Sequence, residues 1–195
     1  MRTGAVGAVL IAGVVAAGAL ALVQPSRSQT GNRVPESVAA FAKVASVLAS
    51  PRCQNCHTLT NFPRQGDDRH AHLFNVTRGG VDHGAPGLPC STCHGKSNNA
   101  ASGAPGAEEV WRLAPLAMGW DDLSTGALCR HLTDPQHNGY RNGRQIIDHL
   151  QSPLVTWAWS PGFDRNGRPR TLPPVSYPDF VRAAELWVSA GVPCP

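Results

Sequence analysis

The sequence predicts an all-α, loop-rich domain. Three observations favour this class: apolar residues recur at helical spacing in four segments, no segment shows the alternation of a half-buried strand, and 20 Gly and 17 Pro interrupt the 195-residue chain. The domain is expected over residues 34–195, after a signal segment over 1–23 and a linker over 24–33. About 170 residues after the signal segment fit one domain.

The first helix is expected over residues 35–49. Pro35 suits the first turn of a helix, where its missing N–H costs nothing. One apolar face follows with helical spacing: Val38, Phe41, Val44 and Leu48. The pair Ser50-Pro51 is expected to end this helix, and residues 58–89 are expected to be mostly loop.

Three further helices are expected after residues that suit an N-cap. Ser124 precedes a segment that carries Leu128 and ends near residues 134–135. Asn142 precedes a segment that ends before residues 152–153. Ser176 precedes the last helix, which is expected to turn three residues inward: Phe180, Ala184 and Trp187.

The N-terminus has the pattern of a signal peptide. Arg2 precedes an apolar, glycine-containing run over residues 5–23, and Ala19-Leu20-Ala21 offers a small-x-small cleavage site. The run is also long enough to span a bilayer, so an uncleaved anchor is the alternative. Its many Gly and Ala residues make a weak anchor and favour cleavage. We therefore expect a periplasmic protein, attached to a membrane only if the segment stays uncleaved.

Two copies of Cys-x-x-Cys-His lie between the expected helices. They are Cys53-Gln54-Asn55-Cys56-His57 and Cys90-Ser91-Thr92-Cys93-His94. In each pentad, two thiols can add to the vinyl groups of one haem, and the adjacent histidine can ligate its iron. The sequence therefore predicts a dihaem cytochrome c-like domain with two covalently bound haem c groups. The alternative is zinc held by four cysteine thiolates, for which both histidines would be coincidental.

The ligand on the other side of each iron is a histidine or a methionine at any distance along the chain. Met118, the one methionine after the signal segment, lies in an apolar loop flanked by Pro and Gly. His72 precedes the apolar pair Leu73-Phe74, and His149 lies on the expected inner side of its helix. We expect His72 at one haem and either Met118 or His149 at the other. The remaining histidines rank lower: His70, His83, His131 and His137.

Cys129 and Cys194 are left once the pentads are assigned. An even remainder in an exported protein favours a disulfide between them, with two buried free thiols as the alternative. The net charge of +4 is modest and the arginines are scattered, so no nucleic-acid partner is expected.

Further stretches resemble a narrower group of exported dihaem proteins, labelled as a subunit of isoquinoline 1-oxidoreductase. The resemblance covers about residues 37–195. It rests on Arg78-Gly79-Gly80, residues 111–120, Leu128-Cys129-Arg130, Asp134-Pro135, Asn138-Gly139, His149, residues 154–162 and the ending 187–195. It implies a partner that is a molybdenum-containing hydroxylase acting on an N-heteroaromatic ring. The chain has no molybdopterin or iron–sulfur motif, so the resemblance implies an electron-transfer subunit.

The function expected from these features is electron transfer between a donor dehydrogenase or hydroxylase and a downstream carrier, with redox proteins as partners. No catalytic acid, base or nucleophile is required, and none stands out. The alternative within haem chemistry is a small dihaem enzyme, either peroxidase-like or a sulfur-compound oxidase. That function would need one iron that lacks a strong protein ligand on its open side.

Overall fold

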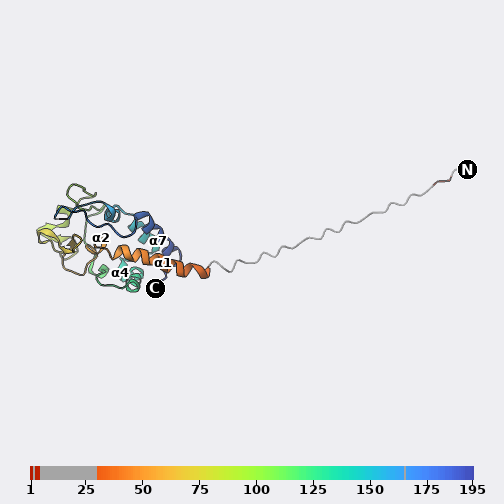
Figure 1. Ribbon diagram of the computed structural model, residues 1–195, viewed down its shortest axis with the longest axis horizontal. Coiled ribbons are helices and arrows are strands. Elements are labelled where there is room, and N and C mark those ends of the chain that lie inside the picture. Colours follow the sequence, from red (N-terminus) through yellow and green to blue (C-terminus); the bar gives the residue numbers. More distant parts are fainter. Residues whose placement is uncertain (2, 5–29, 165) are drawn as a thin grey trace.

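Helices α1 (Thr30–Leu48) and α7 (Tyr177–Ser189) pack along each other and form the centre of the structure (Figure 1). The computed structural model describes residues 1, 3, 4, 30–164 and 166–195. The rings of Phe41 and Trp187 lie 4.8 Å apart between these two helices. Neither ring has exposed surface, so this contact anchors the main hydrophobic core.

Helices α3 (Thr125–Thr133) and α5 (Gly143–Leu150) complete that core, and both begin where the sequence predicted. The Ser124 hydroxyl accepts a hydrogen bond from the backbone N–H of Ala127. Asn142 and Gln145 form a reciprocal capping box at the start of α5. The prediction that Phe180, Ala184 and Trp187 of α7 point inward is also confirmed, because all three are fully buried.

Three four-residue helices were not predicted, and each begins at a proline. They are α2 (Pro51–Gln54), α4 (Pro135–Asn138) and α6 (Pro153–Thr156). Proline suits the first helical position because it needs no N–H partner there and its φ is already helical. The prolines that were expected only to end a helix therefore also start the next one.

The expected loop over residues 58–89 contains two short antiparallel hairpins. One pairs β1 (Arg64–Gln65) with β2 (His70–Ala71), and the other pairs β3 (Gly84–Ala85) with β4 (Leu88–Pro89). The domain is thus mostly helical with a few short strands. Two-residue strands are too short to show a periodic pattern, which is why the sequence did not predict them.

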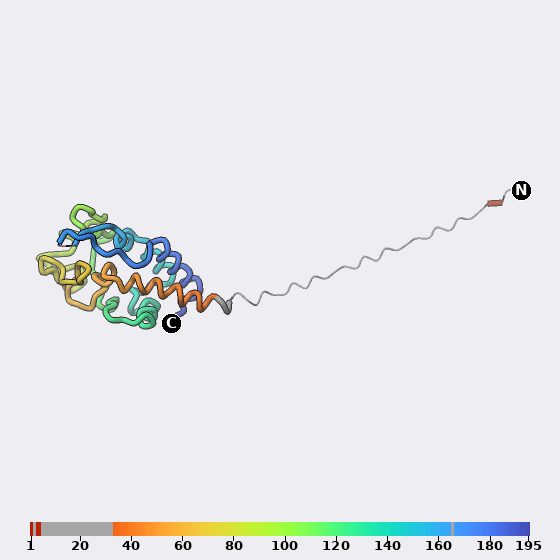
Figure 2. Tube along the Cα trace, viewed as in Figure 1, coloured from red at the N-terminus to blue at the C-terminus, as the bar shows by residue number. Residues whose placement is uncertain are grey.

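The long loops also contain four 3₁₀ turns. They are η1 (Leu73–Asn75), η2 (Cys90–Thr92), η3 (Leu116–Met118) and η4 (Trp157–Trp159). A trace of the chain shows the segment that contains both pentads at the end of the molecule opposite the start of α1 (Figure 2). The chemistry expected of the pentads is therefore gathered at one end of the helical core.

The boundary of the expected linker needs a correction. Residues 30–33 were assigned to the linker over 24–33, but α1 begins at Thr30 and continues through Pro35. The rest of the linker and nearly all of the expected signal segment lie outside the described residues. Among the helices that the structure describes, none has the length and apolar character needed to cross a membrane.

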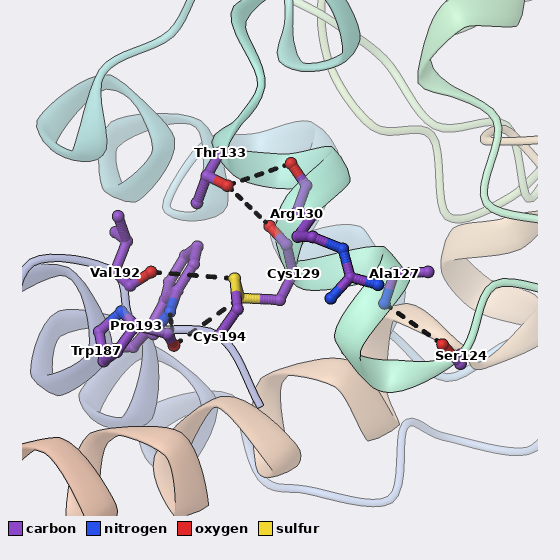
Figure 3. The surroundings of a disulfide bond; sticks show 9 residues. All are labelled: Ser124, Ala127, Cys129, Arg130, Thr133, Trp187, Val192, Pro193 and Cys194. Carbon is purple, nitrogen blue, oxygen red and sulfur yellow. Dashed lines mark hydrogen bonds between the residues drawn. A yellow bond between two sulfur atoms is a disulfide. The ribbon is translucent and has the colours of Figure 1, made fainter.

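The predicted disulfide between Cys129 and Cys194 is present (Figure 3), with a Cα–Cα distance of 5.6 Å. It ties the C-terminal segment to α3. Beside it, the indole N–H of Trp187 donates to the carbonyl oxygen of Pro193 at 3.1 Å. The end of the chain is therefore fixed to the core by a covalent bond and by a buried hydrogen bond.

Candidate haem sites

Both pentads fold into the same tight turn. In the first, the backbone N–H groups of Cys56 and His57 donate to the carbonyl oxygen of Cys53, at 3.2 and 3.1 Å. In the second, Cys93 and His94 donate to the carbonyl oxygen of Cys90 in the same way, at 3.2 and 3.0 Å. Helix α2 supplies the first turn and η2 supplies the second. The backbone of each pentad is therefore fixed as one turn, from its first cysteine to its histidine.

Each pentad histidine is oriented through its Nδ1 atom. The Nδ1 of His57 lies 2.9 Å from the carbonyl oxygen of Met118, and the Nδ1 of His94 lies 2.7 Å from that of Pro105. A carbonyl oxygen only accepts, so both Nδ1 atoms carry the proton and donate. The Nε2 lone pair of each ring is then the metal-binding one. Within the described chain, neither Nε2 atom has a hydrogen-bond partner.

A buried tryptophan stacks on each pentad histidine. Trp120 lies nearly parallel to His57, with 3.6 Å between the ring centres, and Trp111 lies on His94 at 4.1 Å. Neither tryptophan was predicted from the sequence to contact a pentad histidine. No local pattern signals these contacts, because each tryptophan comes from a distant loop.

The two pentads adjoin each other. Cys90 forms a small apolar cluster with Trp111 and Leu113, and Cys56 of the first pentad packs against this cluster. Cys90 is buried, whereas Cys93 is exposed. The two pentads therefore share one wall, and the second pentad also reaches the surface.

His72, predicted as the distal ligand of one haem, lies near His94 of the second pentad, and its role as a ligand stays a prediction. The ring centres of His72 and His94 are 6.2 Å apart. Two imidazoles on opposite sides of one metal ion have ring centres roughly 6 Å apart, since each metal–nitrogen bond is about 2 Å and each ring adds about 1 Å. The Nδ1 of His72 donates to the carbonyl oxygen of Leu73 at 2.9 Å, which leaves Nε2 for a metal.

The backbone carbonyl of Met118 lies at the Nδ1 edge of the His57 ring. Its oxygen holds the Nδ1 of His57, and the methyl group of Met118 lies beside Gly139. The residue therefore contributes to the site through its backbone, as the acceptor that orients the ring. Among the described residues, no contact places the sulfur of Met118 near the Nε2 atom of His57.

His149 is near His57, and both imidazoles are held neutral. Burial lowers the pKa of His57 to about 4; His149 and Arg141 contribute to this, and the hydrogen bond to Met118 opposes it. Burial also lowers the pKa of His149 to about 4, with a further contribution from the charge of Arg141. A neutral imidazole is the form that ligates a metal. No hydrogen bond of the His149 ring to another described residue is found.

Each of the four lower-ranked histidines has a hydrogen-bond partner at one ring nitrogen, and the Nε2 atom of His70 is buried without a partner in the described chain. His70 pairs with Asp68 at 2.5 Å, and the Nδ1 of His83 lies 3.4 Å from the carbonyl oxygen of Trp111. His131 and His137 both bond to the carbonyl oxygen of Ala117, at 2.9 Å each. These last two contacts brace the loop that also presents the Met118 carbonyl to His57.

The four pentad thiols do not form a zinc site in this structure. Of the residues that it describes, no three His, Cys, Asp or Glu side chains are grouped to hold a metal ion. Burial raises the pKa of Cys53 to about 12 and that of Cys56 to about 11, so both thiols are held in the protonated form. Thioether bonds to a porphyrin would remove these protons and would suit the apolar surroundings.

No protein-family model matches the chain, and neither a curated protein nor a solved structure is found to match it.

Proposed function

We propose that the protein is an exported dihaem c-type cytochrome that transfers electrons between redox proteins. One observation carries this proposal: both pentad histidines donate Nδ1–H to a backbone carbonyl, which leaves Nε2 without a partner in the described chain. A carbonyl at Nδ1 is the usual way to orient a metal-ligating histidine. Its repetition at two Cys-x-x-Cys-His turns supports two haems of the same attachment type.

In this proposal, side chains of the protein hold the two haems and tune their redox potentials. Cys53, Cys56, Cys90 and Cys93 attach the porphyrins, and His57 and His94 ligate the irons. His72 completes the second site opposite His94, supported by the 6.2 Å between their ring centres. His149 is preferred over Met118 at the first site, because the Met118 carbonyl already lies on the Nδ1 side of His57. The bound haems supply one-electron redox chemistry.

The arrangement of the pentads suits transfer through the protein. The wall that Cys56 and Cys90 share supports a short electron-transfer distance between the two haems. The exposed Cys93 supports exchange with a partner at the surface. The disulfide between Cys129 and Cys194 is in keeping with a periplasmic location. The partner implied by resemblance is a molybdenum-containing hydroxylase, for which this chain would be the electron-transfer subunit.

Haem quantification tests the proposal. The full chain should be matured in cells with a haem-attachment system, and its mass and pyridine haemochrome content should be measured. Two covalent haems per chain, with a low-spin optical and paramagnetic spectrum, are expected. A chain without haem, or with one zinc ion, would contradict the proposal. Two haems with a large high-spin population would instead favour the dihaem enzyme, because an open iron site is what that chemistry needs.

A further inference from the structure

The two tryptophans that stack on the pentad histidines have unpaired indole N–H groups. Trp111 is 5% exposed and Trp120 is 7% exposed, and the Nε1 atom of each is buried without a hydrogen-bond partner in the described chain. A buried donor left unpaired is costly, because it has lost its hydrogen bond to water and gained none in return. Such a group in a native structure calls for an acceptor that the polypeptide does not supply.

Two tryptophans away from the pentads show the opposite behaviour. The indole N–H of Trp159 donates to the carbonyl oxygen of Val175 at 2.8 Å, and that of Trp187 donates to Pro193 at 3.1 Å. The chain therefore supplies carbonyl acceptors to these buried or half-buried indoles. Of these four indoles, the two with unpaired donors are the ones that lie against the histidines expected to bind iron.

We propose that Trp120 and Trp111 each donate their indole N–H to a propionate carboxylate of the haem held by the neighbouring pentad. This inference rests on the proposed function. The edge of a haem c carries methyl groups, thioether links and two propionates, and only the propionates are strong acceptors. A hydrogen bond to a carboxylate is charge-assisted, which makes it stronger than a neutral one. Each indole then uses its apolar face against histidine and its polar edge against haem.

The donor has a consequence for the iron. An ionised propionate favours the ferric state through its negative charge, and an N–H directed at it offsets part of that charge. Loss of the N–H is therefore expected to lower the midpoint potential of the haem concerned. The potential of the other haem should change much less.

Single Trp-to-Phe variants test this assignment in the full, haem-loaded chain. Trp120→Phe and Trp111→Phe keep an aromatic ring against the histidine and remove only the N–H. Trp159→Phe is the matched control, because its N–H has a backbone acceptor. The measurements are haem content, the propionate bending bands in the resonance Raman spectrum, and both midpoint potentials. We expect each site variant to shift the propionate bands and to lower one potential, a different one in each variant. The control should leave both readouts as in the wild type.

Unchanged propionate bands and potentials in both site variants would overturn the inference, and would assign the indole donors to water. If a variant does not fold, the wild-type holoprotein matured in D₂O decides the matter. Its propionate bands should shift relative to those in H₂O, and bands that coincide would overturn the inference. Haem content separates the two proposals. A chain without two haems refutes the proposed function, whereas two haems with unresponsive bands refute only the role of the tryptophans.

Discussion

At the scale of single residues, a proton position decides which nitrogen of His57 and of His94 is free to bind a metal. Each Nδ1 donates to a carbonyl oxygen, so the electron pair on Nε2 is available to iron. The carbonyls belong to Met118 and Pro105, in loops that come later in the chain. Loop positions that look irregular in the sequence therefore decide which nitrogen of each ring can bind a metal.

Replacing either pentad histidine should damage one haem site. His57→Ala and His94→Ala each remove an axial ligand, so each variant should lose about half of the low-spin absorbance or fail to retain one haem. His137→Ala is the control, because both ring nitrogens of His137 have partners in the chain, the carbonyl oxygen of Ala117 and the carboxylate of Asp134. Optical and paramagnetic spectra of the three proteins check this. Two site variants with wild-type spectra would exclude these histidines as ligands.

The distal ligands can be separated by two substitutions. His72→Ala should convert one haem to high spin, because His72 faces His94 at the separation expected of two axial imidazoles. Met118→Leu should leave both haems low-spin and both potentials nearly unchanged, because Met118 acts through its backbone carbonyl. A redox titration and optical spectra measure both effects. A lower potential and a lost methionine–iron band in Met118→Leu would restore Met118 as the distal ligand.

At the scale of the elements, proline and polar caps determine where the helices begin. The structure uses Ser50-Pro51, Asp134-Pro135 and Ser152-Pro153 to start short helices, while Asn142 caps α5 with a full capping box. Helix α5 carries His149, so this cap also positions a candidate haem ligand.

Removing that cap should destabilise the domain modestly. Asn142→Ala loses the hydrogen bond to the N–H of Gln145, and we expect a decrease of about 1 kcal/mol in the free energy of unfolding. Ser152→Ala is the matched control, because Ser152 precedes α6 without making a side-chain cap bond. Urea unfolding of both variants measures the difference. Equal losses in the two variants would show that the cap bond contributes nothing specific.

The four longer helices were predictable because their signals are local, and the pentads stand out in the sequence for the same reason. Ser124, Asn142 and Ser176 mark helix starts within three residues, and each pentad is contiguous. The partners of the pentads were not predictable, because Trp120 and the Met118 carbonyl reach His57 only through the fold. The two-residue strands and the start of α1 at Thr30 were also not predicted. Hydrophobic periodicity needs several residues before it indicates a strand or the first turn of a helix.

At the scale of the whole molecule, the chain has two unequal cores. The larger one lies among α1, α3, α5 and α7, and the smaller one consists of Cys90, Trp111 and Leu113 beside the second pentad. The long loops around the pentads thus have little apolar support of their own. Porphyrins bound there would supply much of the missing buried surface.

The disulfide should contribute substantially to the larger core. Replacing Cys129 and Cys194 together by Ser removes a link between residues 65 positions apart. The chain-entropy model gives a loss of about 4 kcal/mol in the free energy of unfolding. Thermal or urea unfolding of the oxidised wild type and the double variant measures it, at equal haem content. A difference well under 1 kcal/mol would indicate that the Trp187 hydrogen bond and the surrounding packing already hold the C-terminus.

The wall that Cys56 and Cys90 share would also affect the stepwise reduction of two haems bound on it. Two haem irons bound on either side of this wall, as proposed, would interact strongly through their charges, since the Coulomb energy rises as the local dielectric constant falls. Reduction of one iron would lower the midpoint potential of the other, even where both irons have the same ligands. Reduction is therefore expected to be anticooperative, with a titration curve broader than that of a single one-electron couple. Between its two steps the protein would hold one electron over a wide range of potentials, as a single-electron reservoir.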